Sequence, residues 1–402
     1  MALNKQFDLI LQSPTVAVAD HVLTLKALGR KVIPLQAGDP DFPTPPAVVE
    51  AAISAMKEGL THYGPSRGYP DLRQAIASKF VRRLNKSTDE SAPYDPESEI
   101  LVTHGGVHAF YLATQSILNP GDEVMIPDPN WATHSNIVKM LRGSVTRVPA
   151  HKKNNFIPRI ETWKKLVTQR TRAIVINYPA NPTGVYPPRP YLQQLLDFAS
   201  ENDLWVISDE VYDNLYYEGT PVSVSEFPDA KVRTIIVNSL SKTYSMTGWR
   251  VGYLAAPKVV VENALKAGQN TITCVAPFIQ KAAAFTLGDA EIQKAAKEMR
   301  DTYAKRRKTV MEVYKEYKES PIGVTPPMGA FYYFLDFRKL ELSSSDICNQ
   351  ILEEKGVGLV PGSAFGAQGE GFVRMSIAAS DSDVEEGIRA ILDWARAASR
   401  RM

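Results

Sequence analysis

The residues best suited to chemistry in this sequence lie between positions 239 and 252. Lys242 follows the short apolar run 234–237, and Arg250 comes eight positions later in a turn flanked by glycines. A lysine at the end of a buried strand can be desolvated and lose its proton, which makes its amine a nucleophile toward a carbonyl carbon. The guanidinium of Arg250 can hold a phosphate through two parallel hydrogen bonds. The pair therefore indicates a cofactor that carries both an aldehyde and a phosphate.

Polar or glycine residues also follow three other short apolar runs of the chain. Asn181, Asp209 and the pair Gly105-Gly106 each come shortly after such a run. Ligands of open parallel sheets bind outside the carboxyl ends of the strands. An amide, a carboxylate, a lysine and the backbone N–H groups of a helix start would converge there, which fits pyridoxal phosphate.

Each of these residues also has an ordinary structural interpretation. Asp209 could cap the helix that follows it, and Asn181 could simply be a turn residue. Tyr212 could be a partly buried aromatic residue, and Lys242 taken alone could be a solvated surface lysine. The functional interpretation depends on their convergence, in which Asp209 would pair with a protonated pyridine nitrogen and Asn181 would hydrogen-bond a ring oxygen.

The elements that must position these residues alternate between helices and short apolar runs. Short apolar runs separated by helices are typical of buried parallel strands. We therefore expect an α/β fold, with a large domain built on a mostly parallel, doubly wound sheet that has helices on both faces. The expected strands are 100–102, 123–126, 173–176, 204–207 and 234–237, and helices are expected at 46–58, 71–84 and 107–118.

The last third of the chain changes character, because a long helix rich in Lys and Glu opens a mixture of helices and β-like runs. This mixture predicts a second, smaller α+β domain. Its expected elements are 290–319, 330–335, 345–355, 357–360, 372–377 and a closing helix from 380. We expect an N-terminal arm that belongs to the small domain (1–45), a large cofactor-binding domain (46–290) and a small C-terminal domain (291–402).

The composition excludes several classes of protein. The 402 residues are 44% hydrophobic, which is ample for a large core, and 46 basic residues nearly balance 44 acidic ones, which disfavours a nucleic-acid partner. Cys274 and Cys348 are the only cysteines, so we expect reduced thiols and a cytoplasmic location. Residues 1–13 do not look like a signal peptide, and no apolar run is long enough to span a membrane. We predict no metal site.

With these residues in view, the chain resembles the fold-type I pyridoxal-phosphate enzymes, and most closely the class I/II aminotransferases of the aspartate-aminotransferase superfamily. The resemblance runs from 35–45 to 372–376, and the motifs 181–184, 208–212 and 239–252 occur in the family's order and approximate spacing. It implies an aminotransferase that moves the amino group of an α-amino acid to a 2-oxo acid. The implied mechanism is ping-pong, through a Schiff base of pyridoxal 5'-phosphate on Lys242.

The resemblance also implies roles around the cofactor ring. Lys242 matches the Schiff-base lysine, which also moves the proton, and Asp209 matches the partner of the pyridine nitrogen. Asn181 and Tyr212 match the residues that hydrogen-bond the ring oxygen. Trp131 matches the aromatic residue that stacks on the ring, although it could instead be an ordinary core tryptophan.

Further matches concern the cofactor phosphate. Ser239 and Arg250 match phosphate ligands, joined by backbone groups around Gly106 and Val107. Tyr63 matches a tyrosine that reaches the phosphate of the neighbouring subunit. The resemblance therefore implies a homodimer with shared active sites.

The remaining matches concern the substrate. Arg374 matches the arginine that binds the α-carboxylate, with Gly38 lining the same pocket, and Trp131 and Asn181 are also expected near the substrate. Because Arg374 lies in the expected small domain, closure of that domain would couple substrate capture to catalysis.

Two features depart from the commonest family pattern. Some relatives carry a lysine just after the Gly-Gly turn that can meet a distal carboxylate, and this chain has Val107 there, which weakens a dicarboxylate assignment. His108 and His134 could touch a polar side chain or an unusual substrate, or they could be hydrogen-bonded structural histidines.

The same residues also leave the reaction type open. Lyases, decarboxylases, cyclases, oxidases and condensing enzymes use the same scaffold and the same lysine, and these residues do not decide which bond breaks. A third reading is a non-catalytic sensor with this fold. Such regulators carry a fused DNA-binding module, for which this chain has neither the extra length nor a basic domain.

Overall fold

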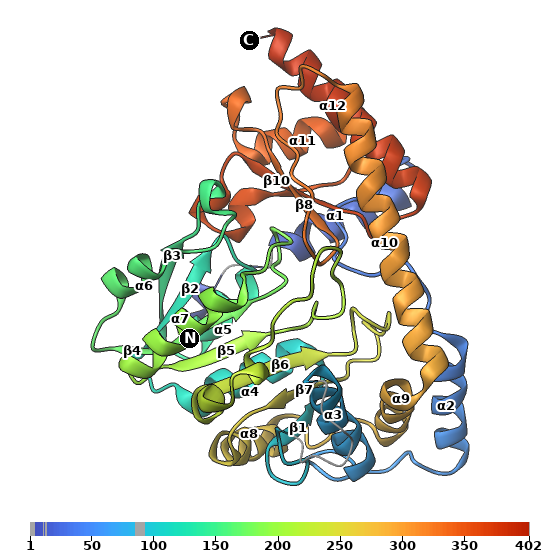
Figure 1. Cartoon of the computed structure of the whole chain (residues 1–402). Coiled ribbons are helices and arrows are strands. Elements are labelled where there is room, and N and C mark those ends of the chain that lie inside the picture. The colour runs from blue at the N-terminus through green and yellow to red at the C-terminus, as the bar shows by residue number, and fades with distance from the viewer. Residues whose placement is uncertain (1–4, 11, 13, 85–92, 402) are drawn as a thin grey trace.

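The computed structural model describes residues 5–10, 12, 14–84 and 93–401. The first residues of the predicted N-terminal arm, positions 85–92 of the predicted large domain and residue 402 lie outside the described residues. Figure 1 shows a lower part built on a large sheet and an upper part built from the C-terminal elements.

The large sheet is mostly parallel, as predicted. Its strand order is β1-β7-β6-β5-β4-β2-β3, and all neighbouring pairs are parallel except those that β7 makes, which are antiparallel. The strands are β1 (Ile100–Thr103), β2 (Glu123–Asp128), β3 (Ser144–Pro149), β4 (Thr171–Asn177), β5 (Trp205–Asp209), β6 (Thr234–Ser239) and β7 (Gly252–Ala255).

Helices cover both faces of this sheet. Successive strand residues point to opposite sides, and both sides carry apolar residues. In β4, Ile174 and Ile176 join one apolar core, whereas Ala173 and Val175 join another. The helices of the first core are α2 (Pro46–Lys57), α3 (Pro70–Arg83), α6 (Ile160–Leu166), α7 (Arg189–Glu201) and α9 (Pro277–Gly288). Those of the second are α4 (Gly105–Ile117), α5 (Ala132–Met140) and α8 (Lys258–Thr271). The doubly wound prediction is confirmed.

A smaller antiparallel sheet carries the C-terminal part, with the order β8-β10-β9. Of the predicted run 357–360, only Val360 enters this sheet, while Val357 makes an isolated bridge with Ile33. The elements are α10 (Ala290–Glu316), β8 (Tyr332–Asp336), α11 (Ser344–Lys355), β9 (Val360–Pro361), β10 (Phe372–Ser376) and α12 (Asp381–Arg401).

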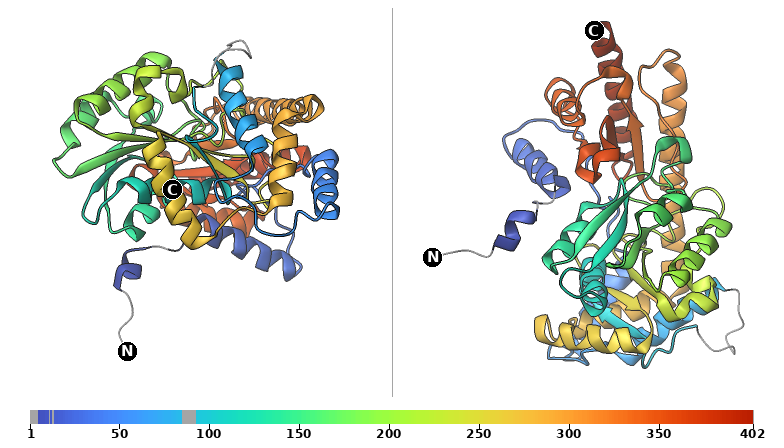
Figure 2. Two further views of the ribbon diagram at one scale, coloured as in Figure 1. Left: turned by 90° about the horizontal axis from the view of Figure 1, so that it is seen from below. Right: turned by 90° about the vertical axis from the view of Figure 1, so that its left-hand side faces the viewer.

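The N-terminal segment packs on these C-terminal elements. Ile33 and Leu35 join their core. In α1 (Pro14–Ala27), Val22 packs with Leu352 of α11. Figure 2 shows α1 beside the C-terminal part in the right-hand view. This packing agrees with an arm that belongs to the small domain, although the domain boundaries stay a prediction.

The long helix α10 lies in both main cores, and Figure 1 shows it running past both parts of the molecule. Its first turns contribute Ile292 and Met299 to the core of the large sheet, and its later turns contribute Tyr303 and Val310 to the C-terminal core. Short 3-10 helices occupy Lys5–Leu9, Lys152–Asn154, Val224–Glu226, Pro228–Arg233, Arg338–Leu340, Gly362–Phe365 and Ala367–Gly369. Within the described ranges, no helix combines the length and the apolar character that a membrane crossing requires.

Candidate active site

A cavity of about 330 Å³ lies where the loops after β4, β5 and β6 meet the start of α4. Its walls come from both sheets and from the N-terminal segment. Of the site residues that the sequence predicts, those that line the cavity are Gly38, Gly106, Val107, Trp131, Asn181, Asp209, Tyr212, Ser239, Lys242, Arg250 and Arg374.

Lys242 lies in the turn that follows β6 and is half-buried. Its Nζ donates a hydrogen bond to the carbonyl oxygen of Gly38 at 2.5 Å. Its pKa is lowered from the ordinary 10.5 to about 8, chiefly by burial; the negative charges of Asp39 and Asp209 oppose the shift, and the positive charges of Arg374 and Arg250 contribute to it. A substantial fraction of this amine is therefore neutral near physiological pH, as a nucleophile requires.

Asp209 ends β5 and is held from two directions. Its Oδ2 lies 3.0 Å from Nε2 of His134, and its Oδ1 accepts a hydrogen bond from the backbone N–H of Val211 at 3.2 Å. The other ring nitrogen of His134 lies 2.8 Å from Oδ1 of Asn130. His134 is fully buried and contacts a carboxylate that the sequence analysis did not connect with it. His108 lies outside this cavity, beside His104.

The Gly-Gly turn, Ser239 and Arg250 form a compact concave surface at the start of α4. A Cβ atom on Gly105, whose φ is +74°, would lie 2.6 Å from a terminal nitrogen of Arg250. A Cβ on Gly106 would lie 3.9 Å from Oγ of Ser239. Glycine at position 105 therefore lets the guanidinium of Arg250 approach the start of α4, while Ser239 lies at an ordinary contact distance from Gly106. This set of donors suits a phosphate.

Arg374 reaches the cavity from β10 of the small sheet. It donates to Oδ1 of Asn181 at 3.0 Å and to the carbonyl oxygen of Gln36 at 2.8 Å. Its buried Nε has no hydrogen-bond partner among the described residues, and none of their carboxylates pairs with it. Burial lowers its pKa. A buried, unneutralised guanidinium with a spare donor suits a carboxylate ligand.

Tyr212 and Tyr332 form a hydroxyl pair at 2.9 Å, and burial raises the pKa of both. The ring of Tyr332 also lies 4.3 Å from the guanidinium carbon of Arg374. Sequence reasoning missed Tyr332, although it stands in the aromatic run of β8. Trp131 contacts the cavity from the N-terminal cap of α5, and its ring packs edge-on against His134.

Tyr63 is the one predicted site residue that does not line the cavity of its own chain. It lies between α2 and α3 and is 86% exposed. The prediction that it serves a neighbouring subunit stays a prediction.

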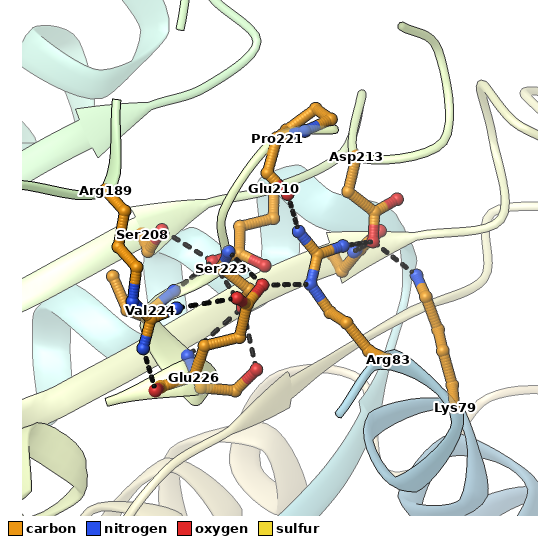
Figure 3. A network of polar contacts seen from close by, with 12 residues as sticks. Lys79, Arg83, Arg189, Ser208, Glu210, Asp213, Pro221, Ser223, Val224 and Glu226 are labelled. Atoms are coloured by element: carbon orange, nitrogen blue, oxygen red, sulfur yellow. Dashed lines mark hydrogen bonds and ion pairs between the residues drawn. The ribbon is translucent and has the colours of Figure 1, made fainter. Parts of the chain in front are cut away.

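Glu210 and Asp213, which follow β5, belong to a buried polar network (Figure 3). Oε1 of Glu210 accepts hydrogen bonds from Ser208 and Ser223, each at 3.0 Å, and burial raises the pKa of Glu210. Oδ2 of Asp213 lies 2.8 Å from Nζ of Lys79 on α3.

The same Asp213 oxygen accepts a hydrogen bond from Nδ2 of Asn238 at 3.2 Å. Oδ1 of Asn238 in turn accepts one from the backbone N–H of Ser239 at 2.7 Å. The network therefore ties α3 to the residue that ends β6.

The sequence analysis also missed the contribution of α1, whose Thr15, Val16 and Ala19 line the cavity. The apolar residues of α1 are spread around the helix, so no face stood out in the sequence. Within the described part of the chain, no group of three His, Cys, Asp or Glu side chains could hold a metal ion.

Comparisons with known proteins identify the family of this chain. Residues 30–391 match the family described as aminotransferase class I and II. The aspartate aminotransferase of Pyrococcus abyssi (strain GE5 / Orsay) is 39% identical, over 96% of this chain and 97% of its own length. Aromatic-amino-acid aminotransferase 2 of Thermococcus litoralis is 36% identical over the same shares. The structure of Thermus thermophilus aspartate aminotransferase with maleate superposes with a TM-score of 0.91 at 34% identity, covering 98% of this chain and 99% of that one.

Proposed function

The chain belongs to the class I and II aminotransferase family, and on that premise we propose that it holds pyridoxal 5'-phosphate on Lys242 and transfers an amino group from an α-amino acid to a 2-oxo acid by a ping-pong mechanism. The residues of the cavity fit this cofactor. Ser239, Arg250 and the start of α4 offer donors for its phosphate, and Asp209 offers a carboxylate for its ring nitrogen. Lys242 offers an amine for its aldehyde.

When bound, the cofactor supplies an electrophilic carbon and a ring that accepts electrons from the substrate. His134 keeps the carboxylate of Asp209 in place through its Nε2 contact. Asn181, Tyr212 and Trp131 line the cavity. Asn181 and Tyr212 would hydrogen-bond the ring oxygen, and Trp131 would supply an aromatic wall.

Arg374 binds the α-carboxylate of the amino acid, which fixes the direction of the Cα–H bond. Lys242 then takes the proton from Cα on its Nζ and later returns one, as a general base and acid. Gly38 accepts the hydrogen bond that holds Nζ in the cavity. The same residues act in reverse order when the 2-oxo acid enters.

The single observation that carries the proposal is the meeting of three groups in one cavity: Lys242 with its lowered pKa, Asp209 backed by His134, and Arg374 without a carboxylate partner among the described residues. Each alone has an ordinary explanation. Together they match what amine transfer needs.

The test begins with borohydride reduction of the protein loaded with pyridoxal phosphate, followed by peptide mass mapping. We expect the cofactor mass on the peptide that contains Lys242. An amino acid alone should then convert the cofactor to its amine form, and a 2-oxo acid should reverse the conversion. Lys242→Ala should lose turnover. Release of ammonia, carbon dioxide or a β-substituent in place of amine transfer would assign the chain to another reaction.

Assembly and location complete the proposal. We infer a homodimer in which Tyr63, 86% exposed in one chain, reaches the partner's phosphate site. We infer a cytoplasmic location from the two cysteines, which are free. The division near residue 290 stays a prediction, since α10, which begins at Ala290, packs in the core of the large sheet before it enters the C-terminal core.

A further inference from the structure

This inference rests on the proposed function and concerns the contact that holds Arg374 in place. The segment 362–369 joins β9 to β10 of the small sheet and contacts the end of β2 in the large sheet. Asp128, the last residue of β2, accepts hydrogen bonds from two backbone N–H groups of this segment. Ala367 donates to its Oδ2 and Gln368 to its Oδ1, each at 3.1 Å. One carboxylate therefore joins the two sheets through two bonds.

The surroundings of Asp128 make this contact specific for one position of the segment. Asp128 is 4% exposed, and a buried carboxylate needs hydrogen bonds to replace those that it made with water. If the segment moved away, Asp128 would lose both N–H partners, which is costly. Gly366, at a φ of +130°, lies against the same carboxylate, and a Cβ atom there would clash with Oδ1 of Asp128. Glycine at this position permits the close approach.

The same segment carries Phe365, which packs beside Arg374. The carbonyl oxygen of Phe365 accepts a hydrogen bond from the backbone N–H of Asn130 at 2.9 Å, so a second bond ties the segment to the residues after β2. The ring of Phe365 is fully buried, and the guanidinium carbon of Arg374 lies 5.2 Å from its centroid. A long arginine side chain that is already held by packing loses less conformational entropy when a carboxylate binds it.

We propose that Asp128 is a positioning residue for substrate binding. By holding the segment 362–369 against the large sheet, it fixes Phe365 and, through that ring, the guanidinium that takes the α-carboxylate. Asp128 itself does not line the cavity. Its effect should therefore fall on the affinity for the amino acid rather than on proton transfer at Lys242.

The first experiment follows the half-reaction of the holoenzyme through the absorbance of the cofactor, with the amino acid that reacts fastest with the wild-type protein. Asp128→Leu keeps the approximate size of the side chain and removes both acceptors. We expect the half-saturating concentration to rise about fivefold or more, while the limiting rate constant stays within about twofold of wild type. Asp128→Asn keeps one acceptor oxygen and should recover part of the lost affinity.

Gly366→Ala disturbs the same contact from the side of the small sheet and leaves the end of β2 unchanged. It should also raise the half-saturating concentration. Combined with Asp128→Leu, it should cost less free energy of binding than the sum of the two separate effects, because both substitutions act on one contact.

The matched control removes a different contact between the two sheets. Nζ of Lys152, which follows β3, lies 2.8 Å from Oδ2 of Asp336 at the end of β8. Asp336 keeps its ion pair with Arg338 when Lys152 is replaced. Lys152→Met should therefore change neither kinetic constant by more than about twofold.

Hydrogen exchange, measured by mass spectrometry on the holoenzyme without amino acid, tests the contact without any reaction. The amides of Ala367 and Gln368 should exchange about tenfold faster or more in Asp128→Leu than in wild type, and at the wild-type rate in Lys152→Met. If Asp128→Leu does not fold, Asp128→Asn and Gly366→Ala serve for both measurements.

The outcomes separate this inference from the proposed function. Faster exchange with an unchanged half-saturating concentration would show that the position of the segment does not govern Arg374, and would overturn the inference. An equal loss of affinity in Lys152→Met would overturn it as well. The aminotransferase proposal would stand in both cases. Absence of a half-reaction of the wild-type holoenzyme with every amino acid would instead overturn the proposed function, and the inference with it.

Discussion

Lys242 has an electrostatic environment that makes its reactivity depend on pH in a defined window. Its pKa of about 8 means that the amine is mostly protonated below that pH and mostly neutral above it. In cofactor-free protein, the rate of adduct formation with pyridoxal should rise about tenfold per unit below pH 8 and level off above it. Rapid-mixing absorbance measurements would follow the rate, with Lys242→Arg as the control. A midpoint near the ordinary value of 10.5 would contradict the environment described above.

His134 is a positioning residue that acts through Asp209. His134→Phe keeps the buried ring but removes the Nε2 contact at 3.0 Å, so kcat should fall by roughly tenfold or more with little change in KM. His134→Gln can still donate to Asp209 and should recover part of the loss. The pH dependence of the cofactor absorbance should shift in the phenylalanine variant as well. An unchanged pH dependence of the cofactor absorbance would show that His134 contributes only packing.

At the scale of residues, the sequence predicted which side chains share one cavity where a rule of topology applied: ligands of parallel sheets bind outside the carboxyl ends of the strands. Asp209 ends a strand, Lys242 and Asn181 follow strand ends, and the structure brings all three to one cavity. The partnership between His134 and Asp209 could not be read, because 75 positions separate the two residues and no local pattern links α5 to β5. Tyr332 was missed for the same reason, because no local pattern links it to Tyr212, whose hydroxyl it contacts.

At the scale of elements, the ion pair of Lys79 and Asp213 fixes α3 against the end of β6. Both side chains are largely buried, with 16% and 4% of their surface exposed. Lys79→Met would leave the charge of Asp213 buried and only partly compensated by Arg83, which lies 3.7 Å away. The free energy of unfolding should fall by about 3 kcal/mol, measured by urea denaturation.

A surface pair provides the control for this measurement. Lys297 and Asp301 lie 2.6 Å apart on α10, with 63% and 53% of their side chains exposed. Lys297→Met should change the free energy of unfolding by no more than about 0.5 kcal/mol. Equal losses in the two variants would show that burial does not govern the effect.

The elements themselves were predictable to different degrees. Continuous apolar runs identified the buried strands β2, β4, β5 and β6 and the sheet class. The edge strand β3 was missed, because it is largely half-buried and carries Arg147. The strand β7 was missed, because it is short and begins at Gly252, directly after the lysine motif. Neither pattern resembles a buried parallel strand.

At the scale of the whole molecule, the proposed dimer predicts complementation between two defective variants. Lys242→Ala and Tyr63→Ala each damage both sites of their own dimer. A mixed dimer would contain one site with intact Lys242 and intact Tyr63, because these residues would come from different subunits. Refolding an equal mixture should restore about a quarter of wild-type activity. Activity no greater than the sum of the two separate variants would place Tyr63 outside the partner's site.

The position of Arg374 has a practical consequence. This residue stands on the small sheet and donates to Asn181, which follows β4 of the large sheet. An amino acid held by Arg374 while its amine lies near Lys242 would join the two sheets through the ligand itself. Because a ligand that binds only the folded state raises the melting temperature, carboxylate compounds could be ranked by thermal shift before any acceptor is known.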